Sequence, residues 1–195
     1  NEHLSFVAPH DGVCYLVIDT AAVGGFAGTV EIYRPACGNG TREHSENCDD
    51  ANTADGDGCD ALCRTELTAS PASETEVNDD FYAANHVLAT GERHVLGEIG
   101  TRCDADSFAF DVAAGATVSL TVLPRAGGAC PTTAPTTELT LHDATGLELR
   151  AATPGPCPTL SVTVTAAGTY FVRVYAPAND AERTFPYELV VAETP

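Results

Sequence analysis

The stretch Thr117-Val118-Ser119-Leu120-Thr121-Val122-Leu123 decides the fold class, because apolar and small polar residues alternate along its whole length. A period of two residues is typical of a β-strand with one buried face. Turn residues separate such segments at close to the spacing of about 8–12 residues found in sandwiches. Only residues 80–85 are compatible with a short helical turn. The sequence therefore predicts an all-β, jelly-roll-like antiparallel β-sandwich, with further strands at residues 107–112, 138–143, 160–164, 169–175 and 187–191.

The charge balance narrows the classes of partner. The 195 residues include 28 acidic and nine basic side chains, all nine of them Arg, for a formal net charge of −19. Such a surface repels phosphate backbones and anionic membranes, so we expect no nucleic-acid binding. It suits divalent cations, or a salty medium that screens like charges. No apolar run reaches the roughly 18 residues of a membrane span, so we expect no membrane insertion.

The eight cysteines indicate a disulfide framework made in an oxidising compartment. Four of them have the spacing Cys37-x10-Cys48-x10-Cys59-x3-Cys63, which fits a zinc site poorly. Cys130 and Cys157 lie in Pro- and Gly-rich loops that flank the strand near residue 139, which favours their pairing. Cys14 would then pair with Cys103, although the other two connectivities stay open. We predict a secreted or cell-surface protein whose signal segment lies upstream of Asn1.

Sequence texture divides the chain into four parts. Residues 1–36 are predicted as strands, residues 37–66 are rich in Cys, Asp, Asn and Gly, residues 67–73 form a linker, and residues 74–195 form the sandwich. Residues 4–18 resemble residues 160–174, since both run strand, Gly-containing turn, aromatic residue, strand. Residues 1–36 are therefore predicted as the last strands of a partial sandwich that packs on the C-terminal domain or on a neighbouring chain, or that belongs to a chain cut from a longer array. The alternative is a coincidental similarity between hairpins.

Residues 37–66 carry a first candidate calcium site. The segment has too few apolar side chains to fold by burial alone, and small scaffolds of this kind need staples or a metal. Ca²⁺ takes six to eight oxygen ligands at flexible angles. The alternative is a solvated acidic loop held only by its disulfides. The candidate ligands are Asn39, Glu46, Asp49, Asp50, Asn52 and Asp57, with Asp55 beside them.

The pattern Cys37-Gly38-Asn39-Gly40, then Glu46-Asn47-Cys48-Asp49-Asp50, then Gly56-Asp57-Gly58-Cys59 resembles the myxobacterial Cys-rich repeat of secreted and surface proteins. Ala51 departs from this pattern, in which Gly is usual. The resemblance implies two disulfides within the repeat and a calcium site.

A second candidate calcium site combines the segment Glu74-Thr75-Glu76-Val77-Asn78-Asp79-Asp80 with Asp104-Ala105-Asp106. Alternate residues of an extended segment face one side. Glu74, Glu76 and Asn78 can therefore converge, and Asp79 can join them if the chain turns there. Asp104 and Asp106 have the same alternation at the start of a strand. The alternative is a plain linker followed by an ordinary strand.

Residues 74–191 resemble the bacterial pre-peptidase C-terminal domain, including its collagen-binding relatives. The resemblance rests on the order of Glu74-x-Glu76-x-Asn78-Asp79, Gly97-Glu98-Ile99, Asp104-x-Asp106-x-Phe108, Leu139-x-Leu141-x-Asp143 and Ala167-Gly168-Thr169-Tyr170. In calcium-binding members the first and third of these motifs share the metal. The resemblance implies that the ligands here are Glu74, Glu76, Asn78, Asp79, Asp104 and Asp106.

The sequence carries no catalytic motif of the G-x-S-x-G or H-E-x-x-H kind, so we predict that the chain is not an enzyme. We predict a non-catalytic structural module, stabilised by calcium and disulfides, that repeats or assembles in an extracellular fibre or adhesin. Its partners would be copies of itself or adjacent domains of a longer chain. The alternative is an accessory domain of a secreted peptidase that binds protein fibres or polysaccharide through an aromatic face formed by Tyr170, Phe171, Tyr175 and Tyr187.

Overall fold

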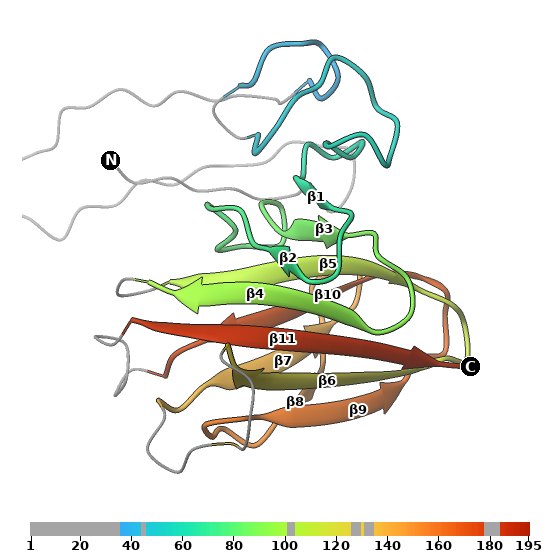
Figure 1. The fold of residues 1–195 in the computed structure, drawn as a ribbon. Coiled ribbons are helices and arrows are strands. Elements are labelled where there is room, and N and C mark those ends of the chain that lie inside the picture. The colour runs from blue at the N-terminus through green and yellow to red at the C-terminus, as the bar shows by residue number, and fades with distance from the viewer. Residues whose placement is uncertain (1–35, 44–45, 101–103, 126–129, 131–134, 178–183) are drawn as a thin grey trace, which may run out of the picture.

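The computed structural model describes residues 36–43, 46–100, 104–125, 130, 135–177 and 184–195. Within these ranges every regular element is a strand, and the strands form two sheets packed as a sandwich (Figure 1). The all-β sandwich predicted from the alternation is therefore confirmed. The described part of the chain contains no helix able to cross a membrane.

The two sheets contain six and five strands. The six-stranded sheet has the order β1 (Glu66–Leu67), β3 (Asn85–Val87), β5 (Ala105–Val112), β10 (Gly168–Tyr175), β7 (Glu138–His142) and β8 (Glu148–Ala151). The five-stranded sheet has the order β2 (Ala72–Ser73), β4 (Arg93–Ile99), β11 (Phe185–Thr194), β6 (Thr117–Pro124) and β9 (Thr159–Thr163). The long strands pair antiparallel.

Both sheets are mixed, so the predicted antiparallel sandwich also contains parallel pairs. The pairs β1–β3, β3–β5 and β2–β4 are parallel. The cause is the path of the chain, because β1 to β5 alternate between the two sheets. When the chain comes back to a sheet after one strand in the other sheet, it runs in its original direction. Therefore β3 runs parallel to β1, β5 to β3, and β4 to β2.

The core lies between the sheets and follows the period-two pattern of the strands. In β6 the inward residues Val118, Leu120 and Val122 are at most 1% exposed. The facing sheet contributes Phe108, Phe110, Leu139, Leu141 and Val172, all of them fully buried. Burial of each such side chain contributes about 1.5–3 kcal/mol, so this layer supplies most of the drive for folding.

Gly97 in β4 is required by close packing with Tyr187, its partner across the β4–β11 pair. A Cβ atom at position 97 would lie 2.3 Å from Cζ of Tyr187, whose side chain is buried in the core. We expect Gly97→Ala to lower the free energy of unfolding by about 1–3 kcal/mol, since the ring has nowhere to move. Urea unfolding measures this loss. Gly155→Ala is the control, because nothing lies within 4 Å of its added Cβ, and equal losses in both variants would contradict the packing argument.

The Cys-rich segment forms a small module beside β1 to β3 (Figure 1). Disulfides join Cys37 to Cys63 and Cys48 to Cys59, so the two bridges implied by the resemblance are present. The module is fastened to the sandwich by Asn47, whose Nδ2 donates to the carbonyl oxygens of Val77 at 2.8 Å and Ala83 at 2.6 Å. Disulfides and polar contacts, more than burial, hold this part of the chain together.

Of the local predictions, two need correction, one is confirmed and two lie outside the described residues. The segment predicted as a linker, residues 67–73, contains the buried Leu67 of β1 and both residues of β2, so it is built into the two sheets. Residues 81–83 form a turn without a helix, and β3 begins at Asn85. Cys130 is bonded to Cys157, as the sequence favoured. The predicted partial sandwich of residues 1–35 and the pairing of Cys14 with Cys103 lie outside the described residues.

Candidate metal site

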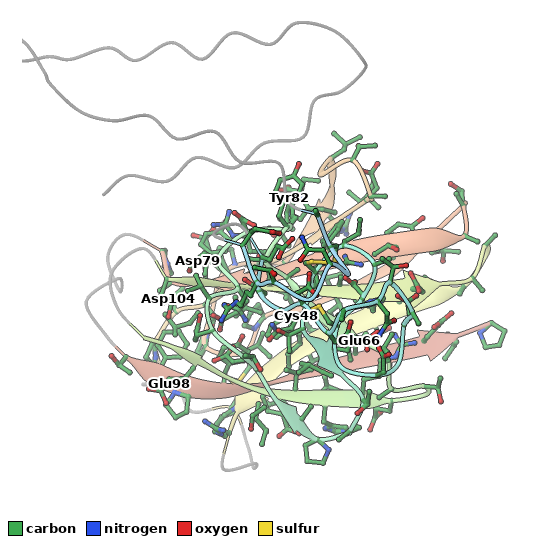
Figure 2. The ribbon with its side chains drawn as sticks, turned by 90° about the horizontal axis from the view of Figure 1, so that it is seen from above. Cys48, Glu66, Asp79, Tyr82, Glu98 and Asp104 are labelled. Atoms are coloured by element: carbon green, nitrogen blue, oxygen red, sulfur yellow. A yellow bond between two sulfur atoms is a disulfide. The ribbon has the colours of Figure 1, made fainter. Side chains whose placement is uncertain are left out.

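The candidate metal site lies where the chain leaves β2 and where it enters β5. Glu74 directly follows β2, Asp104 directly precedes β5, and Asp106 is the second residue of β5. Figure 2 shows Asp79 and Asp104 next to each other at this end of the molecule. Repulsion between carboxylates links Glu74 to Glu76 and Asp106, and links Asp104 to Glu76, Asp79 and Asp106. The structure therefore brings together the second set of residues predicted from the sequence.

Three side chains of this group each hold a buried oxygen that accepts no hydrogen bond within the described structure. These atoms are Glu74 Oε2, Asn78 Oδ1 and Asp106 Oδ1. The residues Asn78 and Asp106 are 0% exposed. Carboxylate oxygens of Glu74, Glu76 and Asp106 lie within 4.8 Å of one another. Since an unsatisfied buried polar atom costs roughly 1–3 kcal/mol, three at one place fit a site for a cation.

The inner ligands are held in position through their other polar atoms. The Glu98 amide donates to Glu74 Oε1 at 2.6 Å, and the Tyr187 hydroxyl donates to Asp106 Oδ2 at 2.5 Å. The main-chain carbonyl oxygen of Asn78 accepts from the main-chain amide of Ser107 at 2.9 Å, which fixes the segment against β5. Glu74 and Asp106 are therefore oriented by the protein while one side-chain oxygen of each stays free, whereas neither the oxygen nor the nitrogen of the Asn78 side chain has a hydrogen-bond partner in the described structure.

The outer carboxylates are anchored in the same way. The main-chain amide of Asn78 donates to Glu76 Oε2, and the main-chain amide of Ala105 donates to Asp79 Oδ1, both at 3.3 Å. The Gly100 amide donates to Asp104 Oδ2. No ion pair among the described residues involves any of these five carboxylates. Their negative charge is thus left for a cation to neutralise.

Protonation equilibria at the site reflect this excess of negative charge. Burial, together with repulsion from Glu74, raises the pKa of Asp106 to about 9. Burial raises the pKa of Glu74 to about 7, with a contribution from Glu76. The pKa values of Glu76 and Asp79 are also raised, first by burial and then by Asp104. The residues could hold a metal ion, because carboxylate oxygens of Glu74, Glu76 and Asp106 converge and a hard divalent cation prefers such oxygens.

The first predicted site, in the Cys-rich module, is arranged differently. Asp49 accepts hydrogen bonds from the amides of Gly38, Asn39, Gly40 and Ala51 at 2.8–3.2 Å, which lower its pKa. Asn39, Asp50 and Asn52 each accept from an amide two residues along the chain, and Asp57 accepts from the Asn52 side chain. These oxygens therefore hold turns of the loop.

Glu46 is the exception in the Cys-rich module. Its Oε1 is buried without a partner, and it lies near Asp49 and Cys63. The sulfur of Cys63 belongs to a disulfide and offers no thiolate. Burial raises the pKa of Glu46. Two carboxylates are far fewer than the ligands that calcium takes, so the second site fits a cation better than the first.

Sequence reasoning missed two acidic residues that organise the module. Glu66 accepts from the amides of Gly56 and Gly58 at 2.8–2.9 Å and so joins the acidic loop to β1 (Figure 2). Asp60 binds Arg64 and contacts His86 of β3 in a buried cluster. The two glycines, spaced two apart in an acidic loop, were a usable signal for Glu66, because successive glycine amides can converge on an anion.

The aromatic binding face considered in the sequence is not formed. Tyr170 and Tyr187 are 6% and 1% exposed and belong to the core between the sheets. Phe171 packs against Phe81 on the outer face of the six-stranded sheet. The hydroxyl of Tyr175, which is half-buried, donates to Glu138 at 2.6 Å. The four aromatic residues therefore serve packing.

Comparison with known proteins bears on the C-terminal part of the chain. Residues 104–176 match the family model of the bacterial pre-peptidase C-terminal domain. This match begins at Asp104 and includes Asp106, while the segment from Glu74 to Asp79 precedes it. The Cys-rich residues 37–66 are also outside it, so their membership of a repeat family stays a prediction. No curated protein is significantly similar to the chain in sequence.

Solved structures show partial likeness. A periplasmic inhibitor of g-type lysozyme, PliG from Aeromonas hydrophila, aligns with 13% identity and a TM-score of 0.43, covering 67% of this chain and 99% of the inhibitor. The pre-peptidase C-terminal domain of collagenase from Bacillus anthracis aligns with 21% identity and a TM-score of 0.41, covering 55% of this chain and 93% of that domain.

Proposed function

We propose that this chain is a non-catalytic extracellular module whose sandwich is locked to its Cys-rich module by a bound calcium ion. The observation that supports it most directly is the set of free, buried oxygens on Glu74, Asn78 and Asp106. Their segment, residues 74–78, connects β2 toward β3 within the sandwich, and Asn47 of the Cys-rich module donates to its Val77 carbonyl oxygen. A cation there would fix the segment on which the Cys-rich module is fastened.

The three disulfides support an oxidising, extracellular location for this module. Residues 74–79 carry the contact that Asn47 of the Cys-rich module makes at Val77. A divalent ion that bridges residues 74–79 to the start of β5 would stiffen this point of attachment. The proposed role is therefore mechanical, as a stiff unit of a surface fibre or adhesin.

Calcium is expected to raise the melting temperature of the EDTA-treated protein. At a calcium concentration about 100 times the dissociation constant, binding to the native state adds about 2.7 kcal/mol. For a chain of this size that corresponds to roughly 5–10 °C by scanning calorimetry. Magnesium should act more weakly, because it requires a smaller octahedral site and releases its waters reluctantly. Glu148→Gln, at an exposed acid of β8, should keep the full shift. A melting temperature indifferent to calcium would remove the ion from the proposal.

The family match at residues 104–176 favours a second function, an accessory domain that retains a secreted peptidase on its substrate. Burial of Tyr170 and Tyr187 speaks against an aromatic binding face. Sedimentation with insoluble collagen and with chitin, each with and without calcium, separates the two functions. Specific retention on one matrix would support the accessory role, and no retention on either would leave the structural role.

A further inference from the structure

Strand β9 lies at one edge of the five-stranded sheet. Its main-chain N–H and C=O groups point alternately toward β6 and away from the sheet. Antiparallel pairing joins it to β6, with Leu120 opposite Leu160. Just beyond the two ends of β9, main-chain amides donate across the same pair of strands. The Val122 amide donates to the Pro158 carbonyl oxygen at 3.0 Å, and the Val164 amide donates to the Ala116 carbonyl oxygen at 2.9 Å. In an antiparallel ladder such bonded pairs recur at every second residue. The N–H and C=O groups of Thr159, Ser161 and Thr163 therefore point away from β6.

The side chains of these same three residues form a ladder of hydroxyl pairs with β6. The oxygen atoms of Thr117 and Thr163 are 2.9 Å apart, those of Ser119 and Ser161 3.0 Å, and those of Thr121 and Thr159 3.1 Å. Close side-chain contact is expected at the non-hydrogen-bonded positions of the ladder. The hydroxyls satisfy one another, so the unused hydrogen-bonding capacity of β9 lies in its backbone.

The other three sheet edges have features that block strand addition, whereas β9 carries no charge or bulge and, among the described residues, pairs only with β6. Edges are normally protected by short length, charge, bulges or a covering segment. The edge strands β1 and β2 have two residues each, and β1 continues directly into the disulfide module. Strand β8 carries Glu148 and Arg150 and has an irregular register opposite Leu141 and His142. Strand β9 has five residues, all uncharged, in regular register with β6.

We propose that β9 pairs with β9 of a second copy of this chain, antiparallel and about a two-fold axis through Ser161. The three outward residues are evenly spaced about Ser161, so Ser161 faces the partner's Ser161 and Thr159 faces the partner's Thr163. Each pair exchanges N–H and C=O groups, and the two five-stranded sheets join into one continuous sheet. The pairing is self-complementary, as a two-fold interface requires.

Charge favours this occupant. Each copy has a net charge of −19, so two copies repel each other wherever acidic surfaces meet. Strands β6 and β9 contain no charged residue, which makes their edge a place where close approach brings no like charges together. Beside β9, a cleft of about 420 Å³ opens between it and the end of β8, lined by residues 150–153 and 159–161. An added strand would cover the cleft.

The location of this edge separates its role from that of the metal site. Figure 1 shows β9 on the side of the sandwich opposite to β1, β2 and β3. A copy bound at β9 therefore leaves the Cys-rich module free for contacts at the other end. Because one five-residue strand buries less than the roughly 1,000 Å² of a stable interface, pairing depends on protein concentration.

Sedimentation velocity of the whole chain at roughly 0.01–1 mM tests the pairing. We expect the average mass to rise toward that of a dimer, and to rise further with added NaCl, because salt screens the repulsion between the copies while backbone hydrogen bonds persist. Wild-type protein that stays monomeric over this range overturns the proposal, whatever other partner the chain binds.

Two substitutions locate the interface. Ser161→Pro removes an outward N–H that makes no bond within the sheet, and Ser161→Lys places like charges opposite each other on the two-fold axis. Both should abolish dimerisation with the circular dichroism spectrum unchanged. Ser161→Thr, and Ser119→Lys on the neighbouring strand β6, should dimerise like the wild type. Dimers that survive Ser161→Lys place the interface elsewhere and overturn the proposal.

Discussion

Replacing Asp60 by Asn is expected to lower the free energy of unfolding by about 3–5 kcal/mol, because it leaves a buried cationic partner without its counter-charge. Asp60 is 2% exposed and Arg64 is 4% exposed. Arg64 Nε donates to Asp60 Oδ2 at 2.6 Å, and the amides of Leu62 and Arg64 both donate to Oδ1 at 2.9 Å. His86 Nδ1 lies 3.0 Å from Oδ2. An Asn side chain keeps the shape of Asp but cannot balance the guanidinium.

The same carboxylate connects the Cys-rich module to the sandwich. Asp60 and Arg64 belong to the module, whereas His86 lies in β3. Arg64 also stacks over the ring of Phe171 in β10, with its Cζ 5.8 Å from the ring centroid. Asp60→Asn should therefore loosen the whole junction. Urea unfolding measures the loss. Asp111→Asn is the matched control, because that exposed carboxylate lies 3.7 Å from the other nitrogen of His86 and its loss should cost little.

Acid unfolding gives an independent reading of the Asp60 contact. Burial alone would raise the pKa of Asp60, but contacts with His86 and Arg64 outweigh it and hold the pKa at about 2, below the ordinary 3.8. The stability from this group is therefore complete above pH 3.8 and is lost as the pH falls through about 2. Since Asn does not titrate, the Asp60→Asn variant should not show this loss of stability between pH 3.8 and about pH 2. If wild type and variant lose stability in parallel between pH 4 and pH 2, the contact contributes nothing.

Most of the long strands were predictable from the sequence because each has a buried face, although the seven-residue β4 was not among the predicted strands. Five to ten residues with a period of two, as in β6 and β11, identify both the strand and its inward side. Strands β1, β2 and β3 were not predictable, because two or three residues show no period. Their parallel pairing follows from a path between sheets that only the folded chain reveals. The sequence consequently predicts a linker at residues 67–73, where the structure has the end of β1 and the whole of β2.

The two acidic clusters show what spacing can and cannot predict. The alternation of Glu74, Glu76 and Asn78 was sufficient to bring these side chains together, because an extended segment directs alternate residues to one side. In the Cys-rich loop the chain turns at almost every residue, so acid side chains find nearby amides instead. Asp49, with four such donors, is the clearest case. Dense carboxylates in a Gly-rich loop therefore predict turns as readily as a metal.

Asp106→Asn is expected to raise stability in the absence of calcium and to remove most of the stabilisation that calcium gives the wild type. Without the ion, the folded pKa of Asp106 is about 9 against an ordinary value of 3.8. Stability from its protonated form is complete below pH 3.8 and is lost as the pH rises toward 9. Asn is neutral at every pH and can still accept from the Tyr187 hydroxyl. In EDTA at pH 8 the variant should therefore be more stable than the wild type by roughly 3 kcal/mol.

Calcium should stabilise the wild type much more than the variant, because the variant has lost a charged ligand at the centre of the site. The wild type should gain stability on adding calcium, and the gain should grow from pH 5 to pH 8 as Asp106 and Glu74 release protons to the solvent. The variant should gain little at any pH. Calorimetric titration in two buffers of different ionisation enthalpy measures the protons released by the wild type. A variant that is less stable than the wild type in EDTA, yet keeps its calcium shift, would show that Asp106 is a structural residue. The buried carboxylate would then stabilise the fold through Tyr187 without binding an ion.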